Sequence, residues 1–420
     1  MDQSVTVNFN TATPTCTGDA DLCAFFTYDK SGSTADAWKA IFDVGSRRLH
    51  IKSPAIVTTS LVSGRAPGIV LKTSCTVVID AGATVKVAAS NQQAGDILIQ
   101  SGCSQTINGK VSNEDAGTLG LPGKITIAAC SGGITTGINS LIQTLGVDPG
   151  GSDINIVSCC SAGDIVLNGL VMGQAHAHVS GAPLPNIRVA AFAGSVTING
   201  NTSTPQINDT TIAGAKYDIY PGLLSLVTSG QVPGKVEVQA SGDVTVRGHG
   251  STGTGAYTSF AAIAAGTLTS NAQGGLVDVR STGGKITGSD RAFQSFGRYN
   301  ATTGRIRLWS SGNIALNLLG GNATFNPVVD SSASGSPSSG GTNEIRSYGG
   351  SITVGSGAVV TAAAATPGTN LLTSCSGVTN NGTVTPADTN TGDDSGTCSP
   401  ATPAPLYSSC SANFNVVFPP

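Results

Sequence analysis

A short phrase repeats along this chain at an interval of just under thirty residues. In each copy, Gly is followed by alternating Ile or Val and then by a corner of Ser and Gly. The first inward aliphatic residues of the early copies are almost evenly spaced, and the later intervals are longer and less regular. A nearly fixed period of this size is typical of a solenoid, whose units bury their apolar faces only by stacking on neighbours. The marker residues are Ile69, Ile97, Ile125, Ile154, Ile187, Val236, Val277, Ile306 and Ile345.

The repeated segments predict short strands, not helices. Each holds two or three aliphatic residues with period 2, and Gly or Ser-Gly corners separate the segments. Most repeats have no helix-period stretch between them, and Leu is not placed as a leucine-rich repeat needs it. We therefore expect an all-β parallel β-helix in which each coil adds roughly 4.8 Å along the axis.

Amino-acid composition and hydrophobic pattern divide the chain into three parts. The first part is an expected N-terminal cap, with an amphipathic helix over 33–42 whose Trp38, Ile41 and Phe42 cover the first coil. The second part holds the coils, with longer excursions, and the third is a Thr/Ser/Pro/Gly-rich tail that contains cysteines and ends in a strand over 412–418. The three parts are residues 1–65, 66–365 and 366–420, and the excursions are 161–186, 199–233 and 248–273.

Charge and hydropathy exclude two classes of partner. Charged residues make up 11% of the chain, the net charge is −3, and there is no basic run, so nucleic acid is not an expected partner. No stretch approaches 18 uninterrupted apolar residues, so we expect no membrane span. The first residues lack a charged and then apolar leader, so a secretory signal is either absent or already removed.

Ten cysteines indicate an oxidising compartment. Four of them recur at about the same interval as the markers, which places them in one column at a corner of successive coils, within disulfide reach. The alternative is a column of free, buried thiols. We expect a loop closed by Cys16 and Cys23, and we expect no metal or cofactor; zinc in particular is not expected because Cys-x-x-Cys pairs are missing. The column is Cys75, Cys103, Cys130 and Cys159, and the remaining disulfide candidates are Cys160, Cys375, Cys398 and Cys410.

The pattern Gly-x-Ile-x-Ile-x-Ser-Gly over residues 66–365 resembles a known group of repeats. It is similar to the secreted right-handed β-helix repeats of filamentous-haemagglutinin-like adhesins and autotransporter passengers. The resemblance implies a right-handed parallel β-helix solenoid and an extracellular role in adhesion, matrix or surface scaffolding. Cysteine is usually scarce in that group, so the cysteine column departs from its pattern.

One outward face concentrates the scarce charge of the later coils. The residues alternating with the inward markers include Glu237, Asp278, Arg280, Arg305, Arg307 and Trp309. Two interpretations stay open for them. They form an ion-pair ladder between coils, or they form a binding face on which Trp309 stacks a sugar ring or a neighbouring subunit.

The best enzyme candidate is Gly248-His249-Gly250 with Arg305-Ile306-Arg307. These resemble elements of polygalacturonases, whose chemistry needs two or three carboxylates near the histidine. The only Asp-Asp pair, Asp393-Asp394, lies in the tail, so we assign no catalytic residue. His176 and His178 are too few to predict a metal site, and a regular Thr-x-Thr array is missing.

Three functions follow from these observations. We expect an extracellular structural or adhesive surface protein without catalytic activity: a filament, matrix or scaffold subunit that associates with itself, with other surface proteins or with polysaccharide. The alternatives are a polysaccharide-binding or polysaccharide-degrading β-helix enzyme and a phage tailspike-like receptor binder. The expected location is secreted or at the cell surface.

Overall fold

The computed structural model forms two compact units, Met1–Arg188 with Ser409–Pro420, and Val189–Ser408. No helix in the part of the chain that it describes is both long and apolar enough to cross a membrane. The structure describes all residues except 2, 116–119, 147–149, 162, 178–182, 201–204, 213–214, 230–232, 250–257, 269–271, 298–303, 321–326, 334–336, 389–401 and 419–420.

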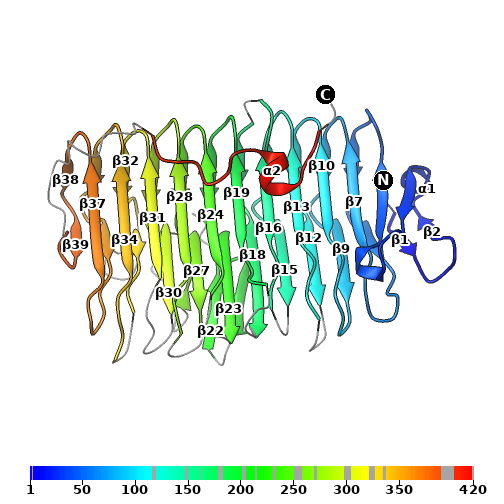
Figure 1. The fold of residues 1–420 in the computed structure, drawn as a ribbon, viewed down its shortest axis with the longest axis horizontal. Helices are drawn as coiled ribbons and strands as arrows, with labels where there is room; N and C mark the ends of the chain where they lie inside the picture. Colours follow the sequence, from blue (N-terminus) through cyan, green and yellow to red (C-terminus); the bar gives the residue numbers. More distant parts are fainter. Residues whose placement is uncertain are drawn as a thin grey trace. The chain divides into compact units, whose positions relative to one another are not determined.

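In the first unit, each coil contributes one strand to each of three sheets, called here sheets B, C and A in chain order (Figure 1). The strands of successive coils pair in parallel. Sheet B holds β4 (Lys39–Asp43), β7 (Gly68–Thr73), β10 (Ile97–Ser101), β13 (Ile125–Ala129) and β16 (Ile154–Ser158). Sheet C holds β5 (Leu49–Ile51), β8 (Val77–Ile79), β11 (Gln105–Ile107), β14 (Ile134–Thr136) and β17 (Ile165–Leu167). Sheet A holds β6 (Ile56–Thr59), β9 (Thr84–Ala89), β12 (Lys110–Asp115), β15 (Leu141–Gly146) and β18 (Leu170–Ala177).

The second unit repeats this arrangement, and β19 (Ile187–Ala191) contains the residues at which the chain passes into it. Sheet B holds β24 (Lys235–Ala240), β28 (Leu276–Ser281), β31 (Arg305–Ser310), β34 (Thr342–Ser347) and β37 (Thr369–Ser374). Sheet C holds β20 (Val196–Asn199), β25 (Val244–Arg247), β29 (Ile286–Ser289), β32 (Ile314–Asn317), β35 (Ile352–Val354) and β38 (Val378–Asn380). Sheet A holds β23 (Gly222–Ser229), β27 (Ile263–Thr267), β30 (Phe293–Gly297), β33 (Val329–Asp330), β36 (Val359–Thr361) and β39 (Thr383–Thr385).

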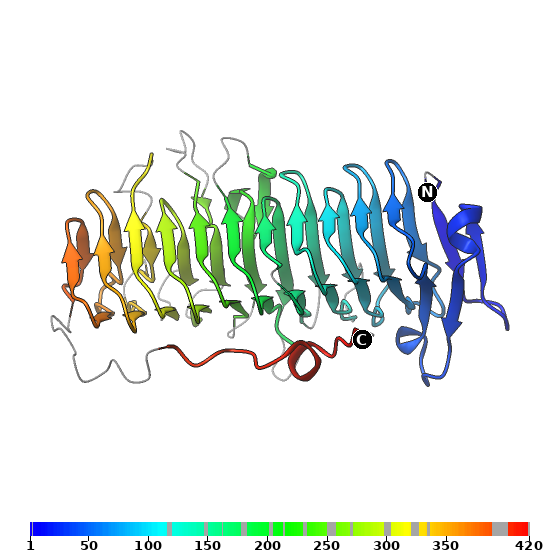
Figure 2. The same cartoon turned by 90° about the horizontal axis from the view of Figure 1, so that it is seen from above.

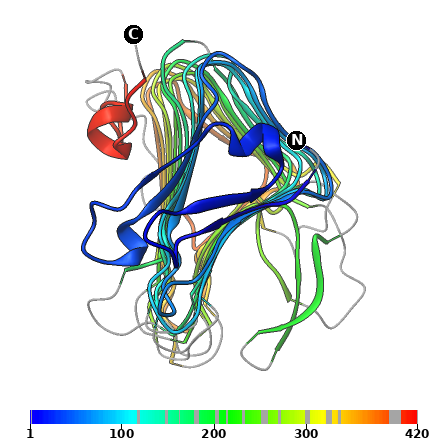
Figure 3. The same ribbon diagram turned by 90° about the vertical axis from the view of Figure 1, so that its right-hand side faces the viewer.

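Each unit is therefore a parallel β-helix, as the repeat predicts, and it is right-handed, as the resemblance implies. Within each unit, strands from successive coils lie side by side along each sheet (Figure 2). The coils of the first unit, blue to cyan, superpose around a three-sided core (Figure 3). A small sheet of β21 (Ile207–Ile212), β22 (Ala215–Ile219) and β26 (Thr258–Ser259) branches from the coils of the second unit within two of the predicted excursions.

The repeated aliphatic residues stack on one another inside the coils. Ile69, Ile97, Ile125 and Ile154 are consecutive partners in sheet B, and all four are fully buried. Each interval between these markers in the sequence therefore equals one coil. In the second unit, Val236, Val277 and Ile306 align in the same way.

The last marker, Ile345, is displaced by one inward position. It pairs with Leu308, whereas the partner of Ile306 is Asn343. Asn343 is fully buried, and its amide donates to the carbonyl of Thr361 at 2.9 Å and to Asn370 Oδ1 at 2.8 Å. Because a polar residue fills this inward position, the aliphatic pattern alone misses the first inward residue of β34.

The coils extend beyond both predicted borders. β4 pairs with β7 in parallel, so the first coil begins at Lys39 instead of after residue 65, and the last coil ends at Thr385 instead of 365. The predicted helix over 33–42 is wrong: a 3-10 turn, η1 (Ala35–Ala37), precedes β4, whose Ala40 and Phe42 point inward and are fully buried. The true cap comprises β1 (Val5–Asn8), β2 (Thr15–Gly18), α1 (Ala20–Cys23) and β3 (Phe26–Asp29), with β2 and β3 antiparallel to their neighbours.

The C-terminal segment is not the predicted strand. Residues 412–418 contain the end of a short helix, α2 (Cys410–Phe414), followed by irregular backbone. Before it, the chain leaves β39 and crosses the edge of β37. There, Leu372 N donates to Asp388 Oδ1 at 3.1 Å, and the amide of Asn370 donates to the Pro386 carbonyl at 2.7 Å.

The disulfides depart in part from the predicted column. Cys16–Cys23 is formed as expected, the other described pairs are Cys130–Cys160 and Cys159–Cys410, and Cys375 is also bonded. Cys75 and Cys103 carry free thiols, contrary to expectation. The strand register explains why Cys103 does not bond to Cys130: Cys75 and Cys103 lie two residues past the aligned Thr73 and Ser101, whereas Cys130 and Cys159 lie one residue past Ala129 and Ser158. The step from Cys103 to Cys130 is therefore one residue shorter than the coil, and this offset divides the column.

Stacking predicts a large difference between two Ile→Ala substitutions. Ile127 is fully buried in β13, whereas Ile138 is 54% exposed at a corner. Ile127→Ala should lower the free energy of unfolding by about 2–5 kcal/mol, because it leaves a cavity between coils. Ile138→Ala should change that free energy by less than about 0.5 kcal/mol. Chemical denaturation measures both, and equal effects would contradict the stacked-core description.

Candidate binding face

The predicted outward residues of the later coils come together on sheet B of the second unit. Two columns of consecutive partners run across β24, β28, β31 and β34, which we call the ladder. They are Glu237, Asp278, Arg307 and Glu344, and beside them Gln239, Arg280, Trp309 and Arg346. Arg305, the remaining predicted site residue, precedes the inward Ile306 on β31.

The charges of the ladder pair with one another. Arg280 donates to both oxygens of Asp278, from Nε and from Nη2, at 2.9 Å each. Arg307 reaches Asp278 Oδ2 at 3.5 Å and Glu344 Oε2 at 3.3 Å, and Arg305 Nη2 lies 2.5 Å from the same Glu344 oxygen. The ion-pair interpretation is thus confirmed. A bidentate Arg–carboxylate pair also fixes the orientation of the guanidinium plane.

Trp309 is packed into the ladder. The guanidinium of Arg280 lies 4.3 Å from the centre of the Trp309 ring, and that of Arg307 lies at 5.4 Å. Tyr348 meets the Trp309 ring edge-on at 6.3 Å, and Arg346 stacks over Tyr348 at 4.6 Å. A sugar stacked on the Arg280 side of Trp309 would have to displace that guanidinium. Trp309 therefore serves here to hold arginines in place by cation–π contact.

Part of the ladder is covered by the chain itself. We call residues 402–408 the strap. The hydroxyl of Tyr407 donates to Glu237 Oε2 at 2.8 Å, and its backbone N–H donates to Gln239 Oε1 at 2.8 Å. Gln239 Nε2 donates back to the Tyr407 carbonyl at 3.1 Å, and Arg280 Nη1 donates to the Ala404 carbonyl at 2.7 Å.

The strap corrects the predicted extent of the binding face. Glu237, Asp278 and Arg280 are at most 9% exposed, so they are not open to a partner while the strap is bound. The side chain of Arg305 is 43% exposed and that of Arg307 is 25% exposed. Sequence patterns could not show this contact, because it joins residues 124 to 170 positions apart. The only signal was a lone Tyr407 in a Pro-rich tail next to Cys410.

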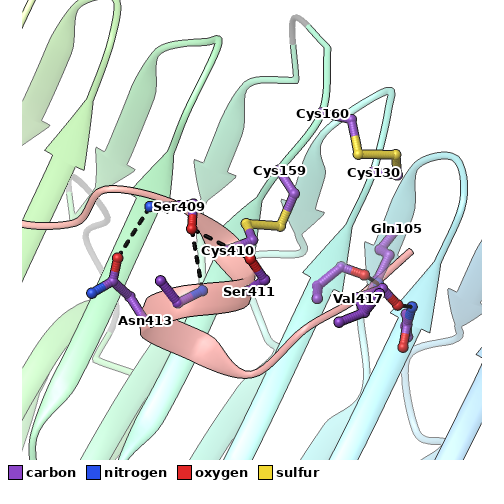
Figure 4. The surroundings of a disulfide bond; sticks show 12 residues. Gln105, Cys130, Cys159, Cys160, Ser409, Cys410, Ser411, Asn413 and Val417 are labelled. Carbon is purple, nitrogen blue, oxygen red and sulfur yellow. Dashed lines mark hydrogen bonds between the residues drawn. A yellow bond between two sulfur atoms is a disulfide. The ribbon is translucent and has the colours of Figure 1, made fainter. Parts of the chain in front are cut away.

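In the first unit, the end of the tail is fixed to sheet B by a covalent bond and by hydrogen bonds. Cys410, at the start of α2, is bonded to Cys159 (Figure 4). The Ser409 hydroxyl caps α2 by accepting from Ala412 N at 3.2 Å, and Gln100 Nε2 donates to the Val417 carbonyl at 2.8 Å. This segment thus has its own fixed place on the coils.

The two parts of the polygalacturonase resemblance lie on different sheets. His249 follows β25 of sheet C and is 2% exposed, with its ring stacked on Tyr220 at 4.0 Å. Arg305 and Arg307 lie on β31 of sheet B, and Gly250 is outside the described residues. His178 is also outside them, and no group of three or more His, Cys, Asp or Glu among the described residues could hold a metal ion.

Tyr407→Phe tests whether the strap is bound. It removes the hydrogen bond to the Glu237 carboxylate, and a bond to a charged group contributes about 1.5–3 kcal/mol. Amide exchange over 402–408, followed by mass spectrometry, should become at least about tenfold faster. Tyr28→Phe is the matched control, since Tyr28 is 43% exposed and forms no side-chain hydrogen bond with a described residue. Equally fast exchange in wild type and Tyr407→Phe would mean that the strap is not bound.

His249 should make stability depend on pH. Burial and then the nearby Arg291 charge lower the pKa of His249 to about 4. In the unfolded chain, His249 takes up a proton near pH 6.5, whereas in the folded protein it stays neutral until about pH 4. Between these values protonation therefore favours the unfolded state, so the stability that is present above pH 6.5 is lost as the pH falls toward 4. The free energy of unfolding should fall by about 3 kcal/mol over this window, and the His249→Gln variant should lack that component. An NMR titration that gives His249 a pKa of about 6 or more would contradict the burial argument.

Comparisons with known proteins identify no relative from which a role for the candidate face could be inferred. No protein-family model, curated protein or solved structure matches this chain. The argument for function therefore starts from the fold and from the contacts described above.

Proposed function

We propose that this chain is an extracellular structural or adhesive surface protein that binds an acidic partner through the uncovered part of the ladder. The observation that carries the proposal is a row of arginines held in place by carboxylates and aromatic rings. Arg, Trp and Tyr are enriched at the energetic centres of protein interfaces. Because their orientations are fixed before binding, less conformational entropy is lost on contact.

The charge balance beside the ladder favours an acidic partner, because exposed cations flank the carboxylates of its first column. The side chains of Arg305 and Lys235 are 43% and 40% exposed, whereas their carboxylate partners Glu344 and Glu237 are 20% and 11% exposed. The cations thus reach further into solvent than the anions that orient them. An acidic polysaccharide or an acidic protein surface would complement such a face.

The cysteines support an extracellular location. The described disulfides join residues 7, 30 and 251 positions apart. The first closes a loop of the cap, the second links adjacent coils, and the third attaches the tail to the coils. Such bonds form and persist in oxidising compartments. This agrees with the secreted or cell-surface location that we expect from the sequence.

The ends of the coils favour adhesion over end-to-end filament growth. At the N-terminal end, the edge strands β2 and β3 are antiparallel to their neighbours and only four residues long. At the other end, the carboxylate of Asp388 accepts a hydrogen bond from the backbone N–H of Leu372 at the edge of β37. Features of this kind protect strand edges from pairing with another chain. No contact in the described residues favours the degrading enzyme or the tailspike-like receptor binder.

A double variant of the ladder tests the proposal. Biolayer interferometry would compare binding to immobilised alginate, hyaluronate and neutral dextran. Wild type should bind the acidic polymers and not dextran, and Arg305→Gln/Arg307→Gln should bind at least about tenfold more weakly, because two charge-assisted contacts are lost. The matched control, Arg247→Gln/Lys285→Gln, removes two charges from the sheet C side of the same unit.

Two outcomes would overturn it. The first is an equal loss in the control variant, which would indicate general charge attraction and no defined face. The second is the absence of wild-type binding to acidic polymers at low salt, where electrostatic contacts are strongest.

A further inference from the structure

A cavity of about 410 Å³ lies in the first unit, between the cap and the first coil. One wall comes from α1 and the residues that follow it, and the other from the corner between β4 and β5. Its volume lies within the range of small-molecule sites in proteins, about 300–1,000 Å³. None of the residues that line this cavity belongs to the ladder.

The floor of the cavity is apolar and fixed in place. Leu22, Val44 and Leu49 line it, and all three are buried. On the α1 side, the Cys16–Cys23 disulfide closes the loop and Asp19 Oδ1 accepts from Leu22 N at 3.0 Å. On the other side, Arg47 N donates to the Val44 carbonyl at 3.2 Å, across a turn that Gly45 completes with φ of +60°. Both walls are therefore ordered without a ligand.

The rim of the cavity carries two arginines that have no acidic partner among the described residues. Neither Arg47 nor Arg48 forms an ion pair or a side-chain hydrogen bond with any described residue. This differs from the ladder, where Arg280 and Arg307 pair with carboxylates. The guanidinium of Arg47 lies 4.9 Å from the centre of the Phe25 ring, which holds it beside the cavity. Asp21, also on the rim, is exposed and likewise has no described ion pair.

We propose that this cavity binds a sugar acid, either free or as a residue of an acidic polysaccharide. Planar guanidinium groups recognise a carboxylate with two parallel hydrogen bonds, so Arg47 and Arg48 would take the acid group. The Asp21 carboxylate accepts hydrogen bonds, so it suits the ring hydroxyls. Because Arg47 lies over the Phe25 ring, Leu22 and Ala24 are the residues that offer an apolar surface to the C–H face of the sugar ring. A fatty acid would leave Asp21 unused, and a neutral sugar would leave both arginines unused.

Calorimetric titration with matched ligands tests the proposal on the full-length protein. Glucuronate and galacturonate should bind, whereas glucose and galactose, which lack only the carboxylate, should not. Benzoate, an acid without hydroxyls, should bind at least about tenfold more weakly than the sugar acids. Tighter binding of oligogalacturonate than of galacturonate would identify a polymer as the source, and equal binding a free acid. Binding of benzoate as tight as that of glucuronate, or of glucose as tight as that of glucuronate, would overturn the proposal.

Variants and amide exchange locate the site. Arg47→Gln/Arg48→Gln should weaken glucuronate binding at least about tenfold. The control Lys52→Gln/Lys124→Gln removes two exposed cations of the same unit that do not line the cavity, and it should bind as wild type does. Arg305→Gln/Arg307→Gln should also leave glucuronate binding unchanged, so this proposal and the ladder proposal fail separately.

The ligand should protect amides of residues 19–25 and 44–50 in the wild-type protein, which decides the question even if a variant does not fold. Protection elsewhere, or none at saturating glucuronate, would overturn the assignment.

Discussion

Hydrogen bonding between successive coils, in a register that repeats within each unit, is the constraint on which the other features depend. It places Ile69, Ile97, Ile125 and Ile154 on top of one another, so the core consists of like residues in contact. The same register aligns the outward side chains into columns. Charges that are scarce in the sequence therefore meet on the ladder, where Arg307 pairs with Asp278 and with Glu344 on the two neighbouring coils.

The sequence was sufficient to predict the alignment of successive coils where inward residues are aliphatic and coils have equal length. It was insufficient where a polar residue faces inward, as Asn343 does, because hydrogen bonds to Thr361 and Asn370 replace the apolar contact. Irregular intervals hide alignment as well. Thr197, Thr245 and Thr287 form one outward column on sheet C, although the two intervals between them are unequal and longer than the early coils. The predicted helix over 33–42 failed because strand pairing with β7 outweighs its local helical pattern.

The candidate site was predicted only in part, for a related reason. Alternation along β24, β28 and β31 correctly indicates which side chains point outward. It accounts for the pair Arg280–Asp278 within β28, and the register accounts for the pair Arg307–Glu344. The strap could not be predicted, since side-chain contacts with a distant irregular segment leave no periodic signal. Its contacts satisfy polar groups of Glu237, Gln239 and Arg280 that lie at or below 9% exposure. The cavity beside α1 was missed as well, because it depends on how the cap folds over the first coil.

The register and the place of the tail together determine which cysteines meet, so disulfide connectivity is the most direct test of the account. Peptide mapping of the non-reduced protein by mass spectrometry identifies each linked pair. The account predicts peptides that join Cys159 to Cys410 and Cys130 to Cys160, with Cys75 and Cys103 free. A bond between Cys103 and Cys130 would contradict the register, and a bond between Cys130 and Cys159 would contradict the place of the tail.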